Sequence, residues 1–252
     1  MRRAAAAITL SRPSVPGMAN PAALLLAQFE AWDTTGTQHT PATRRGFSND
    51  ISETLRRHEI AMTHIAETRE LLDAVETAGI FPVDEYRSEL ATWTTWVLSY
   101  PDGWQPQMPG RMPPNFGAFN NTSMRLLRTL VAQLDRLVPT FEEDQRQSFA
   151  DHIDDLVSTL KGDPSVRGSL AEYMLSLIIH MKHVLAEYDL RGDFALSRAL
   201  LLLKGTVFTA ADVSTHEPSK PKWEWLKAIF TWSPKVAEVA IEWNDVFKQL
   251  GQ

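Results

Sequence analysis

The stretch that decides the fold is residues 165–203, SVRGSLAEYMLSLIIHMKHVLAEYDLRGDFALSRALLLL. Its first part repeats apolar side chains at helical spacing, and Arg191-Gly192-Asp193 then interrupts the pattern. Four successive leucines, 200–203, follow the break and cover every side of a helical turn. Because a helix that is apolar all round belongs in an interior, we expect this turn to be buried on all sides. The apolar repeat before the break consists of Leu170, Met174, Leu177, Met181 and Leu185.

The chain on the N-terminal side of this stretch also has helical patterns. Asn20-Pro21 is a cap and first-turn pair and opens a helix to about Trp32. A long helix is expected from Ser48 to about Ala78, and a third from Val83 to Ser99. The expected apolar line of the long helix is Ile51, Leu55, His58, Met62, Ile65 and Leu72, and that of the third is Tyr86, Leu90, Trp93 and Val97.

Two further helices are expected between the third helix and the stretch quoted above. Thr122 or Ser123 caps the first of them, and Thr140 caps the second, where Glu143 completes a capping box. Alternating strand patterns with tight hairpin turns are not found. The sequence therefore predicts an all-α fold, a multi-helix bundle of about eight to nine helices with a long Pro-rich loop and a C-terminal Trp-rich helical hairpin.

Composition divides the chain into five parts. We expect a flexible N-terminal extension at 1–19, an N-terminal helical unit at 20–99, and an ordered Pro-rich loop at 100–121. A central helical core at 122–213 and a tethered Trp-rich helical pair at 214–252 follow. The first ten residues have only a short apolar run, interrupted by Arg12 and Pro13, so we do not interpret them as a signal peptide.

Charge and cysteine content exclude several classes of function. The 252 residues carry a formal net charge of −6, without a basic stripe or domain, which argues against a nucleic-acid partner. Cysteine is absent, which excludes disulfides, cysteine nucleophiles and thiolate metal sites. These features fit a cytoplasmic protein. We find no run of about 18 apolar residues, and so expect no conventional transmembrane helix.

The last forty residues hold half of the eight tryptophans. A polar, proline-punctuated tether, 214–222, leads into a segment that is apolar on more than one side, and Ser233-Pro234 then opens a narrow amphipathic helix. We favour docking on the chain's own core; the alternatives are a protein partner and, less favoured, a membrane surface, because acids match bases on the polar face. The candidate partner-binding residues are Trp223, Trp225, Trp232, Trp243 and Trp104.

His180, His183 and Glu187 are the strongest candidates for a metal site. Spacings of three and four place them on adjacent helical turns, and imidazole with carboxylate suits a transition metal. A bundle site also needs inward projection and ligands from other helices, whereas His183 lies almost opposite the apolar stripe. We therefore expect no metal and no other cofactor.

Two other polar groups have simpler interpretations. His58 and His64 are six residues apart, too far around a helix to share a metal, so we expect His58 to be a satisfied core histidine and His64, with Glu67, to lie on the surface. The acidic run 151–155 resembles a magnesium-binding group but is expected to be a solvated helix face.

These observations favour a non-enzymatic helical adaptor or regulatory subunit that acts through protein contacts or self-association. One alternative is a membrane-active effector that uses the C-terminal Trp-rich segment. The other is a helical-bundle metalloenzyme, for which only the weak His180, His183 and Glu187 set speaks.

Overall fold

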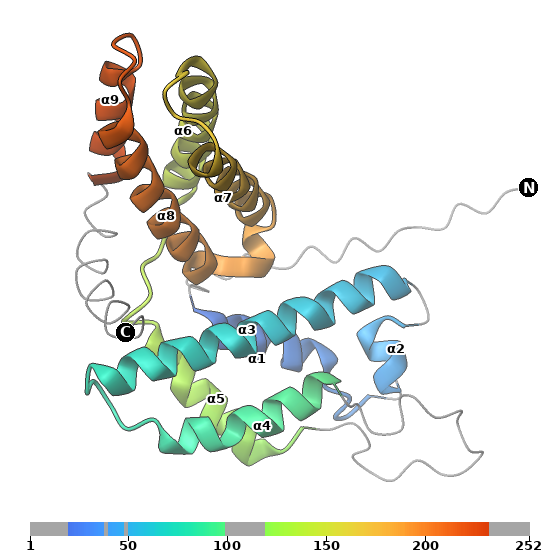
Figure 1. Cartoon of the computed structure of the whole chain (residues 1–252). Helices are drawn as coiled ribbons and strands as arrows, with labels where there is room; N and C mark the ends of the chain where they lie inside the picture. The colour runs from blue at the N-terminus through green and yellow to red at the C-terminus, as the bar shows by residue number, and fades with distance from the viewer. Residues whose placement is uncertain (1–19, 38–39, 48–49, 99–118, 232–252) are drawn as a thin grey trace, which may run out of the picture.

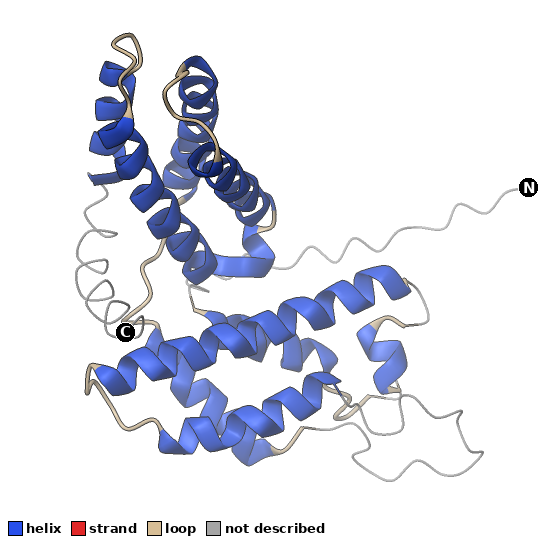
Figure 2. Cartoon of the chain, viewed as in Figure 1, coloured by secondary structure: helices blue, strands red, loops and turns tan. Residues whose placement is uncertain are grey.

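The computed structural model describes residues 20–37, 40–47, 50–98 and 119–231. Over these residues the chain is helical and contains no strand (Figure 2), so the predicted all-α fold is confirmed. The described helices are α1 (Pro21–Trp32), α2 (Pro41–Arg45), α3 (Ile51–Thr77), α4 (Asp84–Leu98), α5 (Asn121–Leu134), α6 (Glu143–Gly162), α7 (Ser169–Ala186), α8 (Tyr188–Val213) and α9 (Lys220–Thr231).

Buried apolar side chains form two separate clusters, and the chain passes from one to the other between Val138 and Phe141. The first cluster collects α1, α3, α4 and α5, together with Phe194 from α8. The second collects α6, α7, α8 and α9. This division differs from the expected parts of the chain, because α5 packs on α1 and α4 instead of joining the helices that follow it.

Each cluster is the core of a four-helix bundle. In the first bundle α1 packs on α3, α3 on α4, α4 on α5, and α5 on α1. In the second, α6, α7, α8 and α9 follow each other around the core in the same way, and α9 returns to α6. A helix in such a ring buries one face and leaves the opposite face in water. Figure 1 shows the two bundles as separate groups whose helices run in different directions.

Side-chain caps begin α1, α2, α3 and α5. The Asn20 side chain accepts a hydrogen bond from the backbone N–H of Ala23, 2.9 Å away, and Pro21 occupies the first turn as expected. Asp50 caps α3, since its carboxylate accepts from the Glu53 N–H at 3.0 Å. Two predicted caps are wrong. α5 is capped by Asn120, not Thr122 or Ser123, and Glu142 with Gln145 forms the capping box of α6 instead of Thr140 with Glu143.

The apolar line predicted for α3 is wrong at its start. Ile51 and Leu55 are 61% and 51% exposed. The cause is length, because α3 has 27 residues whereas its neighbours α1 and α4 have 12 and 15, so its first turns extend past them. The predicted line of α4 is confirmed, since Tyr86, Leu90, Trp93 and Val97 are all buried.

The leucine turn of α8 is buried on one side only. Leu200 and Leu203 lie in the core of the second bundle, whereas Leu202 is 43% exposed and Leu201 is half-buried. The expectation of burial on all sides was wrong, because at this level α8 is one of four helices in a ring and faces water on its outer side. Length and composition alone would let α8 cross a membrane, but 56% of its most apolar window is buried inside the structure.

The connection from α8 to α9 is fixed by a buried carboxylate and is no loose tether. Asp163, at the end of α6, accepts hydrogen bonds from Ser214 Oγ at 2.5 Å, Trp223 Nε1 at 2.8 Å and Ser165 N at 2.8 Å. Burial alone would raise the pKa of Asp163, but these bonds and a fourth from Ser165 Oγ outweigh it and hold the pKa well below its usual range. The carboxylate therefore ties α9 to the end of α6.

Replacing Asp163 by Asn should destabilise the second bundle by about 3 kcal/mol at neutral pH, because several charge-assisted hydrogen bonds are weakened at once. A carboxyl whose pKa is lowered by folding stabilises the protein above its unfolded pKa, about 3.9, and loses this effect as the pH falls below it. Urea unfolding between about pH 7 and pH 3 should show a steeper loss of stability in the wild type than in Asp163→Asn. Equal slopes in the two proteins would contradict this role of the carboxylate.

Candidate functional site

The two bundles meet at the turn between α7 and α8. We call residues 187–194 the elbow. In Figure 1 the first turn of α8, in orange, lies between the second bundle and α3. The elbow supplies contacts to α3, to the segment that links the bundles, and to the core of the first bundle. It is therefore a principal contact between the bundles, beside the packing of α8 on α1 and the ion pair of Arg198 with Glu70 of α3, 2.7 Å apart.

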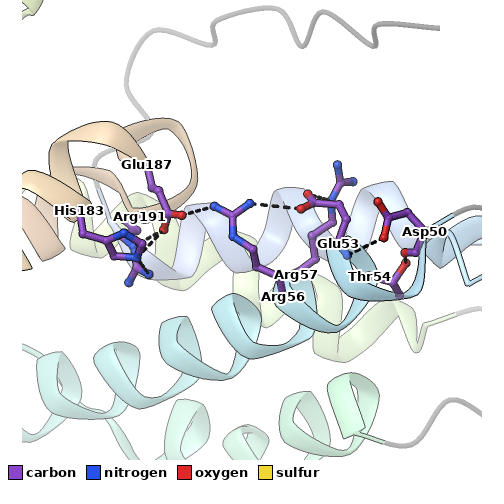
Figure 3. A network of polar contacts seen from close by, with 8 residues as sticks. All are labelled: Asp50, Glu53, Thr54, Arg56, Arg57, His183, Glu187 and Arg191. Carbon is purple, nitrogen blue, oxygen red and sulfur yellow. Dashed lines mark hydrogen bonds and ion pairs between the residues drawn. The ribbon is translucent and has the colours of Figure 1, made fainter. Parts of the chain in front are cut away.

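Glu187 is the centre of the polar contacts at the elbow (Figure 3). Its carboxylate accepts from Arg56 of α3 in the first bundle and from Arg191 Nε, 2.8 Å away, in the second. Burial alone would raise the pKa of Glu187, but the hydrogen bonds from Arg191 and Arg56 lower it. The carboxylate is thus held ionised between cations from both bundles.

The cation from the first bundle is itself held in place. Arg56 Nη1 donates to Glu53 Oε2 at 3.2 Å, and Arg57 Nε donates to Glu53 Oε1 at 2.9 Å. Glu53 lies in the first turn of α3, where its backbone N–H donates to the side chain of the Asp50 cap, as Figure 3 shows. The row from Asp50 to Glu187 therefore connects the start of α3 with the elbow.

His64 makes a second contact across the joint. It is 3% exposed, its Nε2 donates to the carbonyl oxygen of Leu190 at 2.9 Å, and its Nδ1 lies 3.3 Å from Glu67 Oε2. The expectation that His64 and Glu67 lie on the surface was wrong. Ile60, Leu71 and Val75, which are four, seven and eleven residues from His64, are also buried, and this spacing was the sequence signal for the buried face.

The remaining contacts of the elbow fix the linker and an apolar anchor. Asp193 accepts from the backbone N–H of Phe141 at 2.8 Å and from the Tyr188 hydroxyl. Burial raises the pKa of Asp193. The next residue, Phe194, is 6% exposed and packs in the core of the first bundle, although its helix belongs to the second.

Gly192 gives the elbow its shape. The sequence break at Arg191-Gly192-Asp193 is a kink in α8, where Gly192 has φ 73° and ψ −174°. This backbone region is almost restricted to glycine. The kink turns the start of α8 toward the first bundle while the rest of the helix stays in the second.

The candidate metal ligands are engaged in other contacts. His183 Nε2 lies 3.0 Å from Glu187 Oε2 but only 2.8 Å from Arg191 Nη2, a group that repels a metal ion. His180 lies outside this contact; burial and the charges of Arg191, His183 and Arg198 lower its pKa. Within the described ranges, no group of three or more His, Cys, Asp or Glu side chains is arranged to hold a metal.

The predicted partner-binding tryptophans are in different environments. Trp223 is fully buried and bonded to Asp163, which corresponds to docking on the chain's own core. Trp225 is 47% exposed, with the ring of His152 5.3 Å away, edge to face. Trp104, Trp232 and Trp243 lie outside the described residues, as does the amphipathic segment expected after Ser233-Pro234.

Two other predicted groups lie as expected. His58 is satisfied on both ring nitrogens: Nδ1 lies 2.7 Å from the Thr54 carbonyl oxygen and Nε2 lies 3.1 Å from Arg45 Nη1. Burial lowers the pKa of His58. The acids of the run 151–155 are exposed on the outer face of α6, where Asp154 pairs with Lys182 of α7 at 2.7 Å.

An open pocket of about 290 Å³ lies beside the elbow, lined in part by Arg146, Leu185 and Tyr188. The polar side chains that line this pocket contact one another. The Arg146 guanidinium lies 3.9 Å from the Tyr188 ring centroid and pairs with Glu143. The chemistry of the elbow region is therefore that of paired charges.

Searches of protein-family models, curated proteins and solved structures found no match to the chain.

Gly192→Ala should destabilise the protein by about 1–3 kcal/mol, because alanine at this φ and ψ is strained. Gly205→Ala, in the regular part of the same helix, is a matched control: a Cβ there meets nothing within 4 Å, and alanine should stabilise by about 0.5–1 kcal/mol. Chemical unfolding measures both. A Gly192→Ala protein as stable as the wild type would show that the kink is not required.

Proposed function

We propose that this protein is a non-enzymatic helical adaptor or regulatory subunit that acts through contacts with another protein. The observation that carries the proposal is the outer face of α7. Ile179 is 69% exposed and Leu175 is 40% exposed, and their spacing of four residues places them on one side of the helix.

α7 carries large apolar side chains on its outer side as well as its inner side, although Glu172 and Lys182 also lie on the outer side. Its inner side, with Met174, Leu177 and Met181, is already buried in the second bundle. Large apolar side chains on the outer side of a helix are ordinarily covered by a neighbour. The outward-facing Ile179 and Leu175 therefore support a contact with a partner.

Trp225 gives the same bundle a second exposed apolar side chain. Among the tryptophans that the structure describes, only Trp225 is exposed; Trp32, Trp93 and Trp223 are buried and Trp96 is half-buried. Tryptophan is enriched at the centres of protein interfaces, where it contributes more than its area alone. It lies on α9, which packs on α6 and α8, so it adds a face separate from that of α7.

Site-specific photo-crosslinking in the cells that make the protein tests this function. A photoreactive amino acid is placed at position 179, at position 225, or at the control position 59, where Glu59 is exposed on α3 of the first bundle. We expect a discrete protein adduct at 179, at 225 or at both, and none at 59. If one partner contacts both faces, Ile179→Ser should abolish the adduct formed at position 225. The melting temperature of this variant should stay within about 2 °C of the wild type, because the Ile179 side chain is exposed.

The absence of adducts at 179 and 225, or the same adducts at all three positions, would contradict the proposal. Co-sedimentation with vesicles of neutral and anionic phospholipid separates the membrane alternative. Vesicle binding that is lost in Trp225→Ala would replace the adaptor function by that of a membrane-active effector.

A further inference from the structure

The outer face of α8 has almost no charge beyond the elbow. Residues 199–211, ALLLLKGTVFTAA, contain one charged side chain, that of Lys204. Leu202 is 43% exposed and Val213 is 47% exposed, and Thr209 between them is exposed as well. An outer face on a surface helix is ordinarily polar, so this one calls for a cover. We call it the uncovered face; it consists of Leu201, Leu202, Phe208, Thr209 and Val213.

The first bundle does not supply that cover. It contacts the first half of α8, where Phe194 enters its core, α8 packs on α1, and Arg198 pairs with Glu70 of α3. The part of α8 after Leu200 lies away from the first bundle in Figure 1. The cover must therefore come from the chain that follows α9 or from another molecule.

α9 brings the next part of the chain to the uncovered face. Near the start of α9, Trp223 shares the Asp163 carboxylate with Ser214, which lies at the end of α8. One turn further along α9, Lys227 Nζ lies 5.4 Å from the ring centroid of Phe208. α9 therefore runs antiparallel to α8, and its last turn reaches the middle of the uncovered face.

Residues 232–252 follow α9 and lie outside the described residues. Their sequence predicts a helix that opens at Ser233-Pro234 and has one apolar seam with spacings of three and four, which suits a single neighbouring helix. A helix of residues 234–250 is about 25 Å long, and residues 201–213 of α8 extend over about 20 Å, so this segment is long enough to cover the face. The seam consists of Val236, Val239, Trp243, Val246 and Leu250.

Charge favours α8 over α6, the other helix beside α9. Glu238 and Glu242 lie next to the seam. On α6 these acids would meet the exposed acids of the run 151–155. On α8 they would meet Lys204, whose Nζ lies 5.9 Å from the Phe208 ring centroid and, among the described residues, has no acid paired with it. We propose that the segment 234–250 docks on the uncovered face of α8 and adds a helix to the second bundle.

Tethering favours this occupant over a second copy of the chain or a lipid surface. Only Trp232 and Ser233 separate the segment from α9, and so short a link gives an effective concentration in about the millimolar range. The docking does not depend on the partner proposed above. It covers the outer side of the helix whose length and composition would let it cross a membrane, and so controls when that apolar surface is exposed.

Thiol reactivity measures the cover directly. The chain has no cysteine, so Thr209→Cys places one thiol on the uncovered face of the full-length protein, and Ser158→Cys places one on the exposed surface of α6. Each rate of reaction with a maleimide is normalised to that of the same protein unfolded in urea. We expect the thiol at position 209 to react about tenfold slower than the thiol at 158, because a tethered segment covers it most of the time.

Variants in the seam test the occupant. Trp243→Asp, which puts a charge in the seam, should raise the rate at position 209 about tenfold and leave the rate at 158 unchanged. The matched control, Asn244→Asp, adds the same charge one residue away from the seam and should leave position 209 slow. Val239→Ala is a milder change and should raise the rate at 209 by a smaller factor. If Trp243→Asp raises both rates, Val239→Ala decides: a rise at 209 alone supports the docking, and no rise contradicts it.

The other occupants give different results, and each of these overturns the proposal. Slow reaction at position 209 that becomes fast on dilution would assign the face to a second copy, since self-association depends on concentration. Slow reaction only in the presence of phospholipid vesicles would assign it to a membrane. Protection at 158 that is lost in Trp243→Asp would place the segment on α6. Equal rates at 209 and 158, or the same rise in Asn244→Asp as in Trp243→Asp, would show that the seam does not cover α8.

Discussion

The relation between the two bundles depends on one carboxylate, that of Glu187, whose side chain is 14% exposed. Taking a carboxylate out of water is costly unless cations and donors replace its hydration. Here the replacement comes from both sides of the joint, from Arg56 in the first bundle and Arg191 in the second. The carboxylate therefore keeps both of its cations only while the bundles stay together, which couples the arrangement of the molecule to the electrostatics of one turn.

Features of the fold that arise within one helix could be predicted from the sequence. The Asn20-Pro21 start of α1 and the buried stripe of α4 depend on residues no more than one turn apart, and both are found. Exposure on the outer side of a helix depends on what packs there. The apolar pattern alone predicts that Leu202 and Ile51 are buried. Leu202 is exposed because α8 has no described neighbour on the outer side of its four-helix ring, and Ile51 is exposed because α3 extends past its shorter neighbours.

The candidate site was visible in the sequence only in part. His183 and Glu187 attract notice because they are four residues apart on one helix turn, which suggested a metal. In the structure Glu187 instead binds Arg56, which lies 131 residues away in the sequence. No local pattern predicts that pairing. The same holds for His64 with Leu190, 126 residues apart, and for Trp223 with Asp163, 60 residues apart. These contacts become predictable only when the packing of the two bundles is known.

Two bundles with separate cores are held together chiefly by residues 187–194, with the Arg198–Glu70 pair and the packing of α8 on α1 beside them. Small-angle scattering of the double variant Glu187→Gln, Phe194→Ala at neutral pH tests it most directly, because this variant removes the central charge and the apolar anchor of the elbow. We expect the radius of gyration of this variant to be larger than that of the wild type, with the same helical circular dichroism, since each bundle keeps its own core. An unchanged radius, or the loss of helicity in both bundles together, would contradict it.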